Sequence, residues 1–229
     1  MNRELYDFYI INKAHRSRRR PFEPADLSAV YAAEGLSPEE RVCRRFEAVC
    51  CMEEPHIEDF EKIVMVRTVS TLPDCMTEEE WAEIRANHGV HENGYVSNLC
   101  LNYEKVIATG LLAVREEADE YQTRQIDALI DLCDRYRDLA AKQGREDVVS
   151  VLDRVPRYPA RDLREALQFF KILHYSLWIE GDYHNCVGRF DRYMYPYFKA
   201  DIESGKLDRA SALELIEDFF ISFNKDSDI

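Results

Sequence analysis

The chain of 229 residues is 46% hydrophobic and 32% charged, with a formal net charge of −14 at pH 7. This length is enough to bury the core of one large domain or two small ones. The acidic charge argues against a nucleic-acid partner, because phosphate contact needs a basic surface. No apolar run is long enough to span a bilayer, and the N-terminus lacks a signal-peptide pattern. Seven cysteines without a CxxC pair indicate reduced thiols in a cytoplasmic protein.

The first quarter of the chain is predicted to form short helices joined by linkers. Apolar residues recur at helical spacing in residues 2–13, and a basic run follows at residues 15–20. The arginines could hold phosphate or an anionic partner, but an ion-paired helix end is favoured in such an acidic chain. Residues 22–35 form a linker that could contain a helix. Ser37 and Glu40 form a capping box that opens the next helix.

The following stretch mixes extended and helical patterns. The β-branched run Ile63–Leu72 predicts either a strand or an extended segment. Thr77 and Glu80 form a second capping box, which predicts a short helix after it.

Three long helical patterns occupy the rest of the chain. Helical spacing predicts helices over residues 103–143, interrupted near Gly110 and Asp119, over 160–179, and over 208–223. Their expected N-terminal caps include Asn102 and Asp208. We therefore expect well over half of the ordered residues to be helical, with the helix over 160–179 at the centre.

Arg189 and Asp191 stand in a run of aromatic residues after the central helix. Charged groups seldom lie among aromatic rings unless they are paired. We expect both side chains to be largely buried and paired, as a structural ion pair beneath an aromatic layer.

Three segments resemble one enzyme family. VPRYPARDLREALQFFKILH (155–174), GRFDRYMYPYFKADIESGKL (188–207) and GYVSNLCLNYEKVIATGLLAV (94–114) are similar to the N-terminal part of the glycyl radical enzymes, the pyruvate formate-lyase family. The resemblance implies a mainly α chain, the helical N-terminal portion of a ten-stranded α/β barrel whose core is mostly absent. It covers residues 1–229 as a partial domain, with a possible subdivision into N-terminal helices (1–75) and a helical core (76–229).

The same resemblance implies an anaerobic, cytoplasmic lyase or dehydratase that acts on a small polar substrate. Its glycyl radical would be installed by an S-adenosylmethionine-dependent activating enzyme. The family's thiyl-forming cysteine motif and its RVxGY-like glycine loop do not occur in these residues, so we expect the chain alone to be inactive. Its partners would be the remainder of the enzyme or a second copy, most simply in a homodimer. The alternative is a non-catalytic helical interaction module or one chain of a split enzyme.

The substrate-facing segment of the family corresponds to residues 94–114. Pyruvate formate-lyase carries an arginine where this chain has Asn98, and glycerol-type dehydratases carry a histidine. An amide orients a hydroxyl, carbonyl or amide rather than a carboxylate, so Asn98 disfavours a pyruvate formate-lyase activity. The resemblance places Val90 and His91 on the same substrate loop. Asn98 could instead be a turn residue that satisfies local backbone.

A metal reading of the same loop is disfavoured. His88, His91 and Glu92 contain suitable donors, but two histidines three positions apart share a face only on a helix. Gly89 and Gly94 make a helix improbable there. Tyr103 is expected to support the segment as a structural residue behind Asn98.

Overall fold

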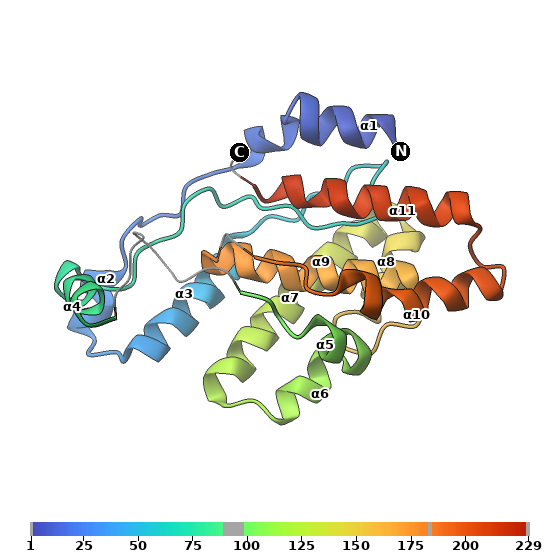
Figure 1. Ribbon diagram of the computed structural model, residues 1–229. Coiled ribbons are helices and arrows are strands. Elements are labelled where there is room, and N and C mark those ends of the chain that lie inside the picture. The colour runs from blue at the N-terminus through green and yellow to red at the C-terminus, as the bar shows by residue number, and fades with distance from the viewer. Residues whose placement is uncertain (1, 89–98, 183–184, 228–229) are drawn as a thin grey trace.

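The computed structural model describes residues 2–88, 99–182 and 185–227, which are mainly helical and contain no strand (Figure 1). The α-helices are α1 (Arg3–Tyr6), α2 (Ser28–Ala33), α3 (Pro38–Met52), α4 (Glu78–His88), α5 (Tyr103–Thr109), α6 (Leu111–Glu116), α7 (Glu120–Lys142), α8 (Glu146–Leu152), α9 (Leu163–Glu180), α10 (Phe190–Glu203) and α11 (Arg209–Ser222). A π-helix, η1 (Asp7–Ile11), and two 3₁₀ helices, η2 (Ala14–Arg18) and η3 (Phe223–Lys225), complete them. No helix in these residues is long and apolar enough to cross a membrane.

Helix α9 is the central helix, as predicted. Side chains around its whole circumference are buried, which is the pattern of a helix enclosed by others. It begins at Asp162, whose carboxylate accepts a hydrogen bond from the Glu165 N–H at 2.8 Å. It ends at Gly181, which has a φ of 103°, because a left-handed residue there lets its N–H reach the last carbonyls. Helices α3, α5, α8, α10 and α11 pack against it.

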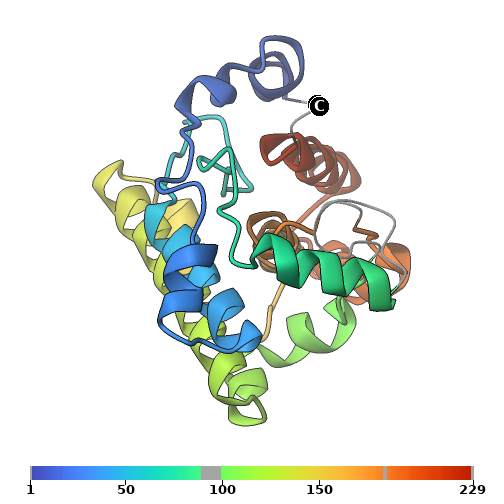
Figure 2. The same ribbon diagram turned by 90° about the vertical axis from the view of Figure 1, so that its left-hand side faces the viewer.

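The other helices form layers around α9. Figure 2 shows α3 and α7 packed together on one side of the molecule, with α11 on the other. Helix α1 lies beside α11 along one edge. The core is one large cluster of buried apolar residues drawn from α2, α3, α5 through α11 and the extended segment 63–69, with a small second cluster under η1.

The predicted helix caps are confirmed. The Thr77–Glu80 capping box is reciprocal, since the Thr77 N–H donates to Glu80 Oε2 at 2.7 Å and the Glu80 N–H to Thr77 Oγ1 at 3.2 Å. Three further caps accept backbone N–H bonds: Ser37 from Glu40 at 3.3 Å, Asn102 from Lys105 at 3.2 Å, and Asp208 from Ser211 at 2.7 Å.

The predicted interruptions of residues 103–143 are also confirmed. Gly110, with φ at 84°, separates α5 from α6, and Asp119 caps α7 with a full capping box. The backbone of Arg157 passes so close that a Cβ at position 110 would lie 2.4 Å from its carbonyl oxygen. The Leu111 N–H donates to the Pro156 carbonyl at 2.8 Å. Gly110 is therefore the point where α5–α6 meets the turn that leads into α9.

The prediction of a strand over Ile63–Leu72 is wrong, and the alternative prediction of an extended segment is confirmed. The segment is buried, but among the described residues its one ladder contact is an isolated bridge between Arg20 and Val69. Side chains from other elements satisfy its amides instead. Val64 N–H donates to Gln168 Oε1 at 2.8 Å, Val66 N–H to Tyr136 Oη at 3.1 Å, and Thr68 N–H to Glu53 Oε2 at 2.7 Å. Such pairing removes the need for a neighbouring strand.

The ion-paired interpretation of the basic run 15–20 is confirmed. Arg18 pairs with Glu58, and Arg20 pairs with Glu54 at 2.5 Å. Arg19 donates to the carbonyl of Lys225 at 3.1 Å. The run therefore ties the N-terminal helices to the segment that follows α3 and to η3.

Two buried lysines hold the end of the described chain in the core. Lys171 pairs with Asp226, and Lys225 pairs with Glu61; all four side chains are at most 1% exposed. The Tyr9 hydroxyl donates to Glu61 at 2.5 Å. Each of these four buried charged groups thus has a partner of opposite charge, which offsets the cost of removing it from water.

Candidate functional site

The described candidate residues meet where α5 and α10 begin against α9. We call this region the Tyr103 junction and define it by Tyr103, Phe170, Tyr193, Cys100 and Cys186. The Tyr103 ring stacks on Phe170 with centroids 4.0 Å apart and lies 6.2 Å from Tyr193. Three separate stretches of sequence therefore converge on one aromatic stack.

Local sequence explains how Tyr103 reaches this position. Asn102 caps α5, so Tyr103 is the first helical residue and its side chain turns inward, with 1% exposure. On the other side, the Tyr193 hydroxyl donates to the Val187 carbonyl at 2.5 Å. The predicted capping role of Asn102 is confirmed, and the structural role of Tyr103 follows from its burial.

The Tyr103 hydroxyl is a buried polar group with no hydrogen-bond partner among the described residues. Burial, and then the thiols of Cys100 and Cys186, raise the pKa of this phenol well above its usual value. The group therefore stays protonated and keeps a hydrogen-bond donor in the junction.

Arg189 and Asp191 are paired but not buried, so half of that prediction is wrong. Their Nε and Oδ1 atoms are 3.3 Å apart, and the side chains are 74% and 75% exposed. Helix geometry explains the difference: Phe190 and Tyr193 share the inward face of α10, whereas the charged residues beside Phe190 point away from it. On a helix, a charged residue next to an aromatic residue in the sequence points in a different direction, so its burial does not follow from that neighbour.

The predicted substrate contacts Val90, His91 and Asn98 lie outside the described residues, as does Glu92. The described chain resumes at Leu99, whose carbonyl accepts a hydrogen bond from the Cys186 N–H at 3.0 Å. Within the described ranges, no three His, Cys, Asp or Glu residues are grouped to hold a metal ion.

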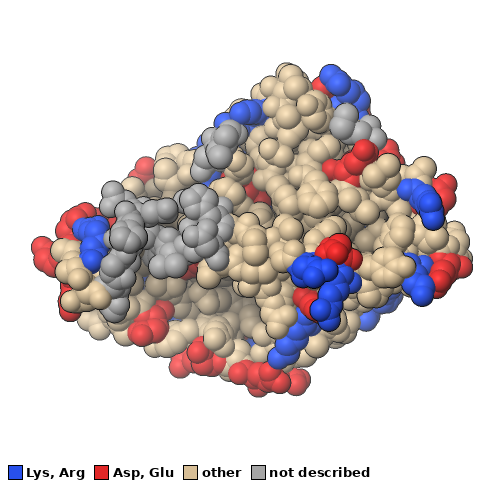
Figure 3. All heavy atoms as spheres, viewed as in Figure 1, with Lys and Arg blue, Asp and Glu red and all other residues tan. Residues whose placement is uncertain are grey.

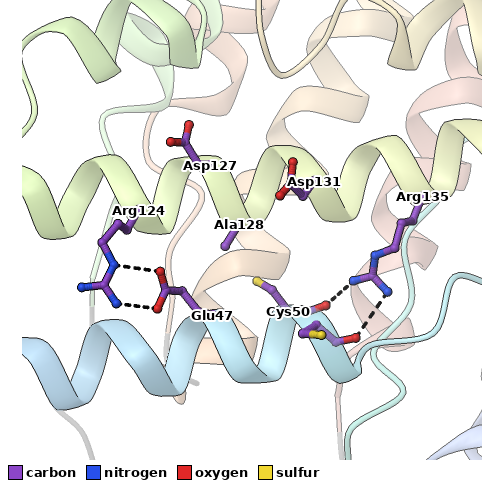
Figure 4. A pocket seen from close by; sticks show the side chains of 8 residues that line it. Glu47, Cys50, Arg124, Asp127, Ala128, Asp131 and Arg135 are labelled. Atoms are coloured by element: carbon purple, nitrogen blue, oxygen red, sulfur yellow. Dashed lines mark hydrogen bonds and ion pairs between the residues drawn. The ribbon is translucent and has the colours of Figure 1, made fainter.

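A separate hollow of about 630 Å³ lies between α3 and α7 (Figure 4). Arg124 spans it to Glu47, with Nε–Oε1 and Nη2–Oε2 distances of 2.8 and 2.6 Å. Arg135 donates to the carbonyls at the C-terminal end of α3, including Glu53 at 2.7 Å. These cations are engaged in helix-to-helix contacts, and a cation suits a helix C-terminus. The hollow is therefore a structural joint.

Sequence reasoning missed this joint, although a signal exists. Arg124, Ala128, Asp131 and Arg135 recur at intervals of four, three and four residues, which places them on one face of α7. In Figure 4, Arg124 on this face points to Glu47 of α3, and Arg135 points to the C-terminal end of α3.

The chain is similar to known proteins in both sequence and structure. A family model described as "Pyruvate formate lyase-like" matches residues 52–228. Isethionate sulfite-lyase of Oleidesulfovibrio alaskensis is 29% identical over 150 residues, which cover 51% of this chain and 18% of that protein. The 4-hydroxyphenylacetate decarboxylase glycyl radical subunit of Clostridioides difficile is 33% identical over 81 residues, 35% of this chain and 9% of that one.

Solved structures extend the similarity to nearly the whole chain. A structure of 1,2-propanediol dehydration in Roseburia inulinivorans matches with a TM-score of 0.73 and 21% identity, covering 98% of this chain and 40% of that chain. At this identity the match shows a shared fold. The aligned part of the chain covers less than a fifth of the length of these relatives. The chain covers two-fifths of the length of the matched structure.

Proposed function

Because the chain belongs to the pyruvate formate-lyase-like family, we propose that it forms the N-terminal helical part of a glycyl radical lyase or dehydratase. The observation that carries the proposal is the match of 98% of the chain to a structure concerned with diol dehydration, at a TM-score of 0.73. The name of another relative, isethionate sulfite-lyase, supports the wider class of lyases.

In this proposal no radical chemistry is assigned to the residues of this sequence. A glycyl radical, installed by an S-adenosylmethionine-dependent activating enzyme, would supply hydrogen-atom abstraction in the cytoplasm. The 229 residues contain no RVxGY-like glycine loop, so the role we assign to the chain is structural support and substrate contact. The helical bundle around α9 provides that support.

We assign substrate contact to the loop that contains Val90, His91 and Asn98. The support is positional: Asn98 directly precedes the segment 99–103, which the Tyr103 junction fixes against α9. An amide both donates and accepts, so it suits a substrate hydroxyl or carbonyl.

Substitution of Asn98 tests this assignment in the anaerobically activated protein that contains the chain. Losing a hydrogen bond to a substrate hydroxyl costs about 1–3 kcal/mol, so we expect Asn98→Ala to lower kcat/KM by about 10- to 100-fold. The radical yield, measured by electron paramagnetic resonance, should stay at the wild-type level. Asn87→Ala, an exposed change on α4, is the matched control and should leave both values unchanged.

Each outcome has a distinct meaning. If no radical forms in the activated wild-type protein, the glycyl radical function is wrong. If the radical forms and Asn98→Ala keeps full kcat/KM, only the substrate assignment fails. The chain alone should give no radical signal after the same treatment.

We further propose that the face of α10 and α11 is covered in the assembled protein. Tyr195, Leu213 and Phe220 are 58%, 57% and 43% exposed there, and a hollow of about 210 Å³ lies between the two helices. Uncharged atoms dominate the part of this face visible in Figure 3. The remainder of the enzyme or a second copy of the chain would cover it, and a helical interaction module would use the same face.

A further inference from the structure

Cys100 and Cys186 are 86 positions apart in the sequence but adjacent in the fold. Burial, and then interaction with the Cys186 thiol, raise the pKa of the Cys100 thiol, and both residues are exposed. The Cys186 N–H donates to the Leu99 carbonyl at 3.0 Å, which ties the two segments together beside the thiols. The pair stands at the edge of the Tyr103 junction.

The backbone contact brings the two cysteine-bearing segments together. Disulfides need Cα separations of about 4.4–6.8 Å, so the two cysteines must lie on segments in direct contact, as the hydrogen bond between residues 99 and 186 provides. Gly188 gives the thiol room, because a Cβ there would lie 3.0 Å from Cys100 Sγ. The Cys100 sulfur therefore lies against the backbone two residues after Cys186.

The remaining five cysteines lack this combination of exposure and partner. Four of them, Cys43, Cys50, Cys75 and Cys133, are buried. Cys51 is exposed, but its sequence neighbour Cys50 points into the core, and adjacent residues on a helix do not face each other. Accessible thiols are the ones that react.

We propose that Cys100 and Cys186 form a reversible intramolecular disulfide on exposure to a low-molecular-weight disulfide such as oxidised glutathione. One protein thiolate attacks the small disulfide, forming a mixed disulfide and releasing one small thiol. The second protein thiolate then attacks the protein sulfur of that mixed bond and releases the second small thiol. The protein loses two protons and two electrons, and the oxidant gains them as two thiols.

The bond would join residues 99–101 to residues 185–187 beside the aromatic stack of Tyr103, Phe170 and Tyr193. Disulfides in a reducing compartment are usually transient and regulatory, and this pair is positioned to lock the segment that leads into α5. The inference does not depend on the proposed function, since it rests on the two thiols alone.

Thiol counting and mass spectrometry test the proposal on the purified 229-residue chain. After treatment with oxidised glutathione at pH 8 and removal of the reagent, we expect the loss of two thiols and of two hydrogen masses. Proteolysis should yield one cross-linked peptide that contains Cys100 and Cys186, and dithiothreitol should reverse the change. A bridge that closes a long loop should also raise Tm, by roughly 5–15 °C for a chain of this size.

Three serine variants complete the experiment. Cys100→Ser and Cys186→Ser should each abolish the cross-link and the rise in Tm, and should retain one glutathione adduct at the remaining thiol. Cys51→Ser should behave as wild type. The proposal is overturned if the wild-type chain accumulates stable glutathione adducts at both positions, or if the cross-link joins other cysteines. Circular dichroism on each variant verifies that the helices are retained.

Discussion

Two aspartates on α10 differ sharply in their surroundings. Asp191 is 75% exposed beside Arg189, whereas Asp201 is buried and accepts a hydrogen bond from the Leu163 N–H at 2.9 Å. We expect Asp191→Ala to leave Tm unchanged, because exposed ion pairs contribute little. Asp201→Ala should lower the free energy of unfolding by about 1–3 kcal/mol, because it strands a buried amide at the start of α9. Urea unfolding of both variants measures the difference, and equal effects would contradict the assigned burial.

His174 makes the stability of the fold depend on pH. Burial, followed by the nearby Lys171 cation, lowers the pKa of His174 from 6.5 to about 4. The folded state thus favours the neutral ring, and the unfolded chain takes up the proton first as pH falls. Stability from this group is therefore lost between pH 6.5 and about 4.

The corresponding variant is His174→Gln, which cannot titrate. Between pH 6.5 and 4.5 the wild-type chain should lose about 2 kcal/mol more unfolding free energy than the variant. Chemical denaturation at the two pH values measures this. Parallel pH profiles for the two proteins would show that another group is responsible.

At the scale of helices and turns, Gly110 leaves no room for a side chain. Gly110→Ala meets both a left-handed φ and the Arg157 carbonyl at 2.4 Å. Gly144 has a similar φ of 72° but open space around it, so Gly144→Ala should cost only the backbone term of about 1–2 kcal/mol. We expect Gly110→Ala to cost at least twice as much, as measured by thermal unfolding. Similar losses would mean that the turn before α9 moves aside readily.

Helix starts and breaks were predictable because they depend on local chemistry. Thr77, Asn102 and Asp208 mark N-termini through side chains that accept nearby N–H groups, and Gly110 marks a break through its backbone. The separate helix α8 was not expected.

Features that depend on distant partners were not predictable from local pattern. Ile63–Leu72 remains extended because Gln168, Tyr136 and Glu53 supply its hydrogen bonds from far along the chain. The exposure of Arg189 and Asp191 was missed because their side of α10 depends on where Phe190 packs. The site candidates Val90, His91 and Asn98 remain predictions that follow from sequence resemblance.

At the scale of the whole molecule, α10 and α11 expose the large apolar side chains Tyr195, Leu213 and Phe220. Contiguous apolar surface is uncommon on monomers and usually marks an interface. We expect the isolated chain to self-associate, most simply as a two-fold dimer. Light scattering at micromolar concentration measures this, and Phe220→Glu together with Leu213→Glu should shift the chain toward monomer. A wild-type monomer that binds no hydrophobic dye would contradict the expectation.

The buried lysines also set an order of events during synthesis. Lys171 is translated 55 residues before its partner Asp226, and Glu61 is translated 164 residues before Lys225. At about 5–20 residues per second, the ribosome needs roughly 3–11 s to travel from Lys171 to Asp226. Throughout that interval the nascent α9 carries an ammonium group whose counter-ion does not yet exist, so closing the bundle around it is unfavourable. The central helix is therefore translated before the carboxylate that neutralises Lys171, and the bundle can close around that lysine only once Asp226 has been made.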